Sequence, residues 1–167
     1  QTGQNWLSTA PSEVKELIRK TILEPLEERK LLGSTPQLTE INDEISLSVR
    51  EQYEENPYPR WNHFPQLQSS RYATNLAKSL PALKGKAPLF PSHPDVLIAG
   101  CGTGQQPIST ALAFPETNIL AVDLSLASIA YAKRKTTELK IKNITYGQAD
   151  IMELQSLDKK FDVIECG

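Results

Sequence analysis

The stretch VLIAGCGTGQ, residues 96–105, decides the fold. Four apolar residues lead into three glycines at every second position, Gly100, Gly102 and Gly104, and a helix-like run follows. A short apolar run that ends in glycine is typical of a buried strand. Because glycine has no Cβ, the loop can turn tightly and let a ligand lie against the backbone. The N–H groups at the start of the next helix favour a phosphate or a carboxylate.

Strand-like and helix-like segments alternate from Asp95 to Gly167. Strands are expected at 95–100, 117–125, 143–150 and 161–167, and helices at 105–114, 126–140 and 151–157. Ser125 is expected to cap the helix over 126–140. This alternation predicts an α/β, Rossmann-like fold, in which helices pack around a parallel sheet.

Residues 1–90 lack this alternation of strand-like and helix-like segments and are expected to form an α-helical region. Segment 11–33 carries an amphipathic stripe that Pro25 should kink or divide, formed by Val14, Leu17, Ile18, Ile22 and Leu26. Further helices are expected at 39–56 and 69–80, and the proline-rich stretch 81–94 reads as a linker. The sequence thus predicts two parts, a helical region over 1–90 and a sheet region over 91–167.

Composition narrows the class of protein. The net charge of -2 gives no basic field that would draw the chain onto nucleic acid. The two cysteines, Cys101 and Cys166, form no C-x-x-C pair, so a metal site is not expected, and a disulfide between them is the weaker alternative. Sparse cysteines favour the cytoplasm, and no apolar stretch is long enough for a membrane span. The chain starts without Met and stops after an apolar run, so we expect it to be part of a longer protein.

Two acids follow expected strands. Asp123 ends the second strand, 19 residues after Gly104, where a carboxylate can accept both hydroxyls of a ribose. Asp150 ends the third strand and can either contact the exocyclic amine of an adenine or cap the next helix. For the glycine loop itself, a merely tight turn without a ligand is the competing interpretation.

The segments DVLIAGCGTGQ, ILAVDLS, YGQADI and FDVIECG resemble motifs one to four of the class I S-adenosylmethionine-dependent methyltransferases, in order and spacing, over residues 95–167. The resemblance implies strands 1–4 of a seven-stranded sheet, with S-adenosylmethionine as methyl donor, or its product S-adenosylhomocysteine, bound at its edge. It implies that the glycines lie under the methionine part and ribose, Asp123 on the ribose and Asp150 on the adenine. The complete set of predicted donor-binding residues is Gly100, Cys101, Gly102, Thr103, Gly104, Asp123, Leu124, Asp150, Ile151, Glu165, Tyr58 and Arg60.

One residue departs from the family pattern. Members often carry an acid two residues before the first glycine, where this chain has Ile98. The resemblance therefore assigns no donor contact to the end of this strand. Asp95 stands at the other end of the strand and cannot replace it.

A second segment, YEENPYPRWNHF over residues 53–64, resembles the region before the methyltransferase domain in bacterial proteins that often also carry tetratricopeptide repeats. Two prolines stiffen this segment around Tyr58, Arg60 and Trp61. We predict that it closes over the donor pocket, with Arg60 available for a carboxylate. The alternative is an aromatic packing corner between helices and sheet.

The predicted activity is therefore methyl transfer to an acceptor that the sequence does not identify. A sulfonium donor is already activated, so the protein must orient the acceptor and exclude water, and no catalytic base is assigned. Glu165 and Cys166 are expected near the donor's methyl group. A non-catalytic module of the same fold stays open, and an NAD-dependent oxidoreductase is disfavoured because Gln105 stands where the dinucleotide pattern has glycine.

The strand expected over 161–167 is apolar and reads as an interior strand. We therefore expect its free edge to be paired by residues that this chain lacks or by a neighbouring molecule. We also expect the 167 residues alone to transfer no methyl group.

Overall fold

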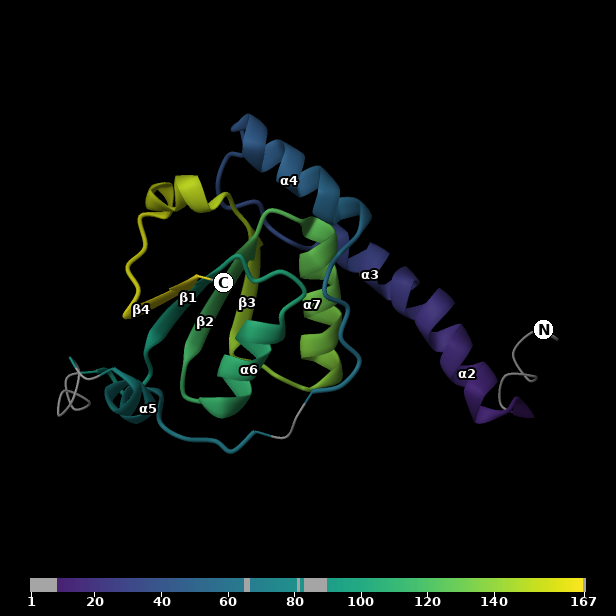
Figure 1. Ribbon diagram of the computed structural model, residues 1–167, viewed down its shortest axis with the longest axis horizontal. Coiled ribbons are helices and arrows are strands. Elements are labelled where there is room, and N and C mark those ends of the chain that lie inside the picture. Colours follow the sequence, from purple (N-terminus) through teal and green to yellow (C-terminus); the bar gives the residue numbers. More distant parts are fainter. Residues whose placement is uncertain (1–8, 65–66, 81, 83–89, 167) are drawn as a thin grey trace.

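The computed structural model describes residues 9–64, 67–80, 82 and 90–166, and its centre is a parallel four-stranded sheet (Figure 1). The strands are β1 (Asp95–Ala99), β2 (Asn118–Asp123), β3 (Ile144–Gln148) and β4 (Val163–Cys166), in the order β3-β2-β1-β4. The predicted α/β sheet is confirmed. After β3 the chain crosses to the other side of β1, so the carboxyl ends of β1 and β4 form the switch point where ligands of such sheets bind.

Each face of the sheet carries its own apolar core. Val96 and Ile98 of β1 face the helices α5 (Tyr72–Ser79), α6 (Gln105–Ala113) and α7 (Leu126–Glu138). Leu97 and Ala99 face the other side, where the 3₁₀ helix η4 (Ile151–Leu157) contributes a smaller cluster. The alternation follows from the two-residue period of a strand. The predicted cap of α7 is confirmed, because Ser125 Oγ accepts the Ser128 N–H at 3.0 Å.

The N-terminal segment forms one long helical rod in three parts (Figure 1). These are α2 (Ser12–Ile18), the π-helical turn η1 (Arg19–Leu23) and α3 (Glu24–Leu32), so the division predicted at Pro25 is a π turn just before it. The apolar stripe on this rod is largely exposed, with Leu17 at 61%. The buried positions of α3 are instead Glu24 and Glu28, which meet Arg134 of α7.

The helix predicted over 39–56 is shorter in the structure. Helix α4 covers Glu44–Glu55, because Asp43 Oδ2 accepts the Ser46 N–H at 2.9 Å and caps it. Residues 36–39 are extended and lie against the outer edge of β3, where the Leu38 N–H donates to the Gln148 carbonyl at 2.7 Å. Gly147 of β3 leaves room for Leu38, since a Cβ there would lie 2.3 Å from Leu38 Cδ1. The N-terminal region therefore pairs with the carboxyl end of β3 at one edge of the sheet.

The opposite edge is β4. This strand pairs with β1, and no other described residue pairs with its outer side. Ile164 on it is 64% exposed. Most of the predicted linker 81–94 lies outside the described residues. Both cysteines are free, so the disulfide alternative is wrong, and no described helix is long and apolar enough to cross a membrane.

Candidate functional site

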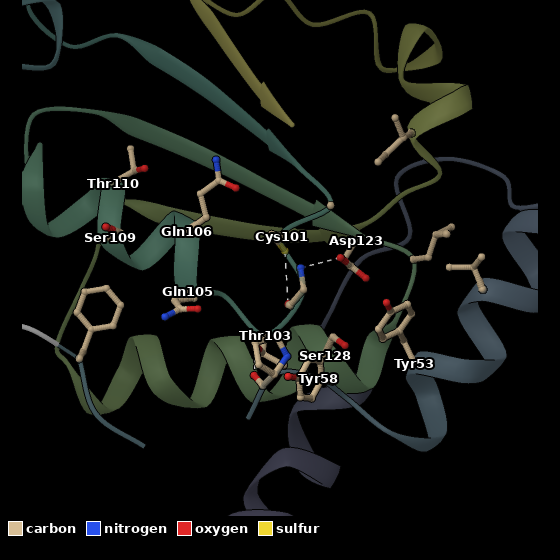
Figure 2. A pocket seen from close by; sticks show the side chains of 17 residues that line it. Tyr53, Tyr58, Cys101, Thr103, Gln105, Gln106, Ser109, Thr110, Asp123 and Ser128 are labelled. Carbon is tan, nitrogen blue, oxygen red and sulfur yellow. Dashed lines mark hydrogen bonds between the residues drawn. The ribbon is translucent and has the colours of Figure 1, made fainter. Parts of the chain in front are cut away.

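A cavity of about 870 Å³ opens at the carboxyl ends of β1 and β2 (Figure 2). Its floor is the glycine loop, and its walls come from α6, the start of α7 and the N-terminal region, which supplies Val49, Tyr53, Tyr58, Pro59 and Phe64. The cavity thus lies where a parallel sheet of this order binds its ligands, and segments far apart in the sequence build it together.

The three glycines of the loop all have positive φ, at 75° for Gly100, 50° for Gly102 and 85° for Gly104. A Cβ at Gly102 would meet nothing within 4 Å, so this glycine leaves its space open at the cavity that it lines. A Cβ at Gly104 would lie 2.6 Å from Ala132 Cβ of α7. Gly104 therefore permits the close packing of the loop on α7, whereas Gly102 is free to face a ligand.

Asp123 lines the cavity at the end of β2, and backbone donors hold its carboxylate. Its Oδ2 accepts the Gly102 N–H at 2.7 Å and its Oδ1 accepts the Ser125 N–H at 3.0 Å. Burial raises the pKa of Asp123, against the lowering effect of these hydrogen bonds, and the nearby Glu54 carboxylate raises it further. The arrangement presents a shielded carboxylate across from the glycine loop, as a ribose would require.

Helix α4 is clamped onto the start of α7 next to Asp123. The Glu54 carboxylate accepts the N–H groups of Leu126 at 2.6 Å and Ala127 at 3.0 Å, and Ser125 Oγ donates to the Tyr53 carbonyl at 3.1 Å. A carboxylate on the first N–H groups of a helix is favourable both as a cap and toward the helix dipole. Sequence reasoning missed this contact, because nothing local to Glu54 indicates a partner 72 residues away.

The segment around the two prolines is divided between the cavity and the packing behind it. Tyr58 and Pro59 line the cavity, and Pro59 accepts a hydrogen bond from Thr103 Oγ1 of the glycine loop. Trp61 is buried and its Nε1 donates to the Thr103 carbonyl at 3.1 Å. Arg60 does not line the cavity but pairs with Glu28 at 2.7 Å. The packing-corner interpretation therefore fits Arg60 and Trp61, and the predicted donor contact of Arg60 is corrected.

Next to the β3 side of the cavity, Asp150 has the capping role considered for it, and its contact with an adenine stays a prediction. Its Oδ1 accepts the Met152 N–H at 2.9 Å and caps η4. Its Oδ2 is buried, and no described residue gives it a hydrogen-bond partner. Leu124 and Ile151, the apolar residues that follow β2 and β3, line the cavity beside it. The cavity therefore has apolar surface at this side, and the unpartnered Asp150 Oδ2 is buried behind it.

At the opposite side, Glu165 stands behind the cavity wall. It accepts a hydrogen bond from the Tyr72 hydroxyl and another from Gln106 Nε2 at 2.8 Å, and Gln106 lines the cavity. Sequence reasoning also missed a set of wall residues, which are Val49, Phe64, Gln106, Ser109, Thr110 and Ser128. The polar residues at 106, 109 and 110 share one face of the helix after the glycine loop, and this spacing was a usable signal. Among the described residues, no three His, Cys, Asp or Glu side chains are grouped to hold a metal.

Comparison with protein families finds a match to the methyltransferase domain over residues 96–167. A release factor glutamine methyltransferase of Rhodopirellula baltica is 29% identical over 163 residues, which are 95% of this chain and 50% of that protein. An uncharacterized protein of Rickettsia prowazekii is 32% identical over 114 residues, 68% of this chain and 43% of its own length. This chain therefore spans about half the length of these relatives.

Among solved structures, PKMT2 of Rickettsia typhi in complex with AdoHcy is similar at 28% identity, with a TM-score of 0.47. The match covers 63% of this chain and 20% of that protein.

Proposed function

We propose that this chain is the donor-binding part of a class I S-adenosylmethionine-dependent methyltransferase. The family match over the sheet region and the methyltransferases among its relatives support this assignment. The observation that carries it is Asp123, a partly buried carboxylate at the end of β2 that lines the cavity and is hydrogen-bonded to a loop of three positive-φ glycines. The acceptor is not identified.

The residues of the cavity fit the donor part by part. Gly102 leaves open space for a ligand against the backbone, and Asp123 stands where a ribose would offer its two hydroxyls. Ile151 lines the cavity and suits the face of an adenine, and the unpartnered acceptor Asp150 Oδ2, buried behind the lining, is the candidate partner of its amine. Gln105 lines the cavity at the position where a dinucleotide pattern has glycine, which disfavours NAD.

Methyl transfer requires the protein mainly to position the reactants and to exclude water. When bound, S-adenosylmethionine supplies a methyl group already activated on a sulfonium. The chain's own residues hold the ribose through Asp123 and wall off water with Val49, Tyr53 and Tyr58. We further propose that the segment 53–64, which resembles a region of bacterial tetratricopeptide-repeat methyltransferases, closes over the donor pocket through Tyr58 and Pro59. The free cysteines suit a cytoplasmic enzyme.

Calorimetric titration with S-adenosylhomocysteine tests the proposal. We expect saturable binding by the purified protein, no binding of NAD, and at least about tenfold weaker binding of S-adenosylhomocysteine to Asp123→Ala, since a hydrogen bond to a charged group contributes roughly 1.5–3 kcal/mol. The exposed Asp158, far along the chain in a loop after η4, gives the matched control Asp158→Ala, which should bind normally. Unchanged affinity in Asp123→Ala, or preference for NAD, would contradict the assignment.

A further inference from the structure

Three side chains from three elements form a hydrogen-bonded chain at the β4 side of the cavity. Tyr72 of α5 donates its hydroxyl to one oxygen of Glu165, and Gln106 of α6 donates Nε2 to the other at 2.8 Å. Tyr72 is 4% exposed, and burial together with the Glu165 carboxylate raises its pKa, so its hydroxyl stays protonated as a donor. The Glu165 carboxylate is thus held from two sides.

This chain fixes the orientation of the Gln106 amide. A carboxylate only accepts hydrogen bonds, so the amide must turn its NH₂ group to Glu165. Its carbonyl oxygen is then left for the cavity that Gln106 lines, and no described residue donates to that oxygen. The wall therefore presents an acceptor with a carboxylate directly behind it, which is a site for a cationic hydrogen-bond donor.

The sheet order places this acceptor at one end of the ligand. Leu124 and Ile151 lie past β2 and β3, Asp123 ends β2, and Gln106 lies toward β1 and β4. A ligand with its ribose on Asp123 and its adenine on the β3 side must extend its other end toward β4. Figure 2 shows the same sequence of groups, with Asp123 on one side of the loop and Gln106 on the other.

The position of the Glu165 carboxylate in the sheet also supports a site for a cation. Ile98, where an acid was expected, is the register partner of Glu165 on the neighbouring strand. Glu165 therefore brings a carboxylate to the same level of the sheet, one strand away, at about 4.8 Å in a parallel pair. Among the described residues that line the cavity, only Asp123 has a charged side chain. No lining residue on the β4 side of the cavity therefore carries a charge that could pair with a cation.

We propose that Gln106 and Glu165, braced by Tyr72, form the recognition site for the ammonium group of the donor's amino-acid part. Gln106 contacts the ammonium through its carbonyl oxygen, and Glu165 is a positioning residue that orients the amide and supplies the negative charge. The proposal rests on the proposed function, because it takes S-adenosylmethionine or its product as the ligand.

Calorimetry with three ligands and a set of variants tests the proposed ammonium site. The ligands are S-adenosylhomocysteine, its decarboxylated form, which keeps the ammonium, and 5′-methylthioadenosine, which lacks the amino-acid part. We expect Gln106→Leu and Glu165→Gln to weaken the two ammonium-bearing ligands at least about tenfold and to leave 5′-methylthioadenosine within about twofold. Tyr72→Phe should cause a smaller loss of the same selectivity. Asp158→Ala, at an exposed position that does not line the cavity, is the control and should change none of the three affinities.

The outcomes separate the two proposals. If the unaltered protein binds none of the three ligands, the proposed function fails. If it binds all three but the variants weaken them equally, Gln106 and Glu165 have only a structural role and the inference is overturned. Loss of S-adenosylhomocysteine without loss of the decarboxylated ligand would assign the site to the carboxylate and also overturn it. Thermal unfolding of each variant identifies any that has lost the fold, and Gln106→Asn, which keeps the amide, then replaces Gln106→Leu.

Discussion

At the scale of single residues, two glycines of one loop have different tasks, and alanine should separate them. Gly104→Ala combines left-handed backbone strain with a contact of 2.6 Å to Ala132 Cβ, so we expect a loss of about 2–4 kcal/mol in the free energy of unfolding. Gly102→Ala meets only the strain and should cost about 1–2 kcal/mol, but its methyl group enters the cavity and should weaken S-adenosylhomocysteine more strongly. Urea denaturation and calorimetry measure the two effects. Equal loss of stability in both variants would contradict the division of roles.

Asp123 should give stability and ligand affinity opposite dependences on pH. Burial raises its pKa above the ordinary 3.8, so just above 3.8 the folded protein keeps a proton that the unfolded chain has released. The contribution of Asp123 to stability is therefore fully present below 3.8 and is lost as the pH rises through the folded pKa. Affinity for S-adenosylhomocysteine needs the carboxylate and should fall as the pH is lowered. Titration between about pH 7.5 and about pH 4.5 should show this fall, and Asp123→Ala should lack it.

At the scale of elements, Glu54 should anchor α4 to α7. Glu54→Ala leaves the first N–H groups of α7 without their carboxylate, so we expect a loss of about 1–2 kcal/mol in the free energy of unfolding, together with weaker donor binding because Val49 and Tyr53 line the cavity. Glu55→Ala, at the exposed neighbouring position, should change stability by less than about 0.5 kcal/mol. Equal behaviour of the two variants in urea denaturation would show that the clamp contributes nothing.

The buried ion cluster between α3 and α7 should be sensitive to the loss of one partner. Arg134, 5% exposed, pairs with both Glu24 and Glu28, so Arg134→Met removes the cation that they share. Because Arg19 still pairs with Glu24 and Arg60 with Glu28, the loss should stay below the roughly 3–5 kcal/mol of a buried charge left without a partner. Replacing all three by apolar residues of similar size should recover most of that loss. Arg29→Met, exposed on α3, serves as the control. Thermal and urea unfolding of the three proteins measure the difference, and a neutral Arg134→Met would contradict the role of the cluster.

The elements also show what sequence could and could not predict. All four strands and the two long helices of the sheet region were predictable, because their patterns are local and Ser125 marks a helix start. The rod was misread, since its stripe of apolar residues is exposed while Glu24 is buried by Arg134, a partner more than a hundred residues away. In the site, Asp123 was predictable from its place at a strand end, whereas Glu54 depends on a tertiary contact that no spacing reveals.

At the scale of the whole molecule, the sheet has one covered edge and one exposed edge. Unpaired backbone groups and the exposed Ile164 make β4 a template for association between chains. We expect the 167-residue chain to self-associate at high concentration, and Ile164→Lys to reduce this association in light scattering. Met152→Lys changes an apolar residue on η4 that is even more exposed, and it should have less effect. No difference between the two variants would show that the edge is not the contact.

The extended residues 36–39 along β3 bear on how such a protein can be assembled from parts. Leu38 occupies the space that a side chain at 147 would need, so the glycine and the leucine are matched across more than a hundred residues. A recombination that exchanged the helical region for another would uncover β3 and leave an empty slot above Gly147. The two regions are therefore expected to be inherited together, and a chimaera should fold well only if its new N-terminal region also brings an extended segment with a large apolar residue at that point.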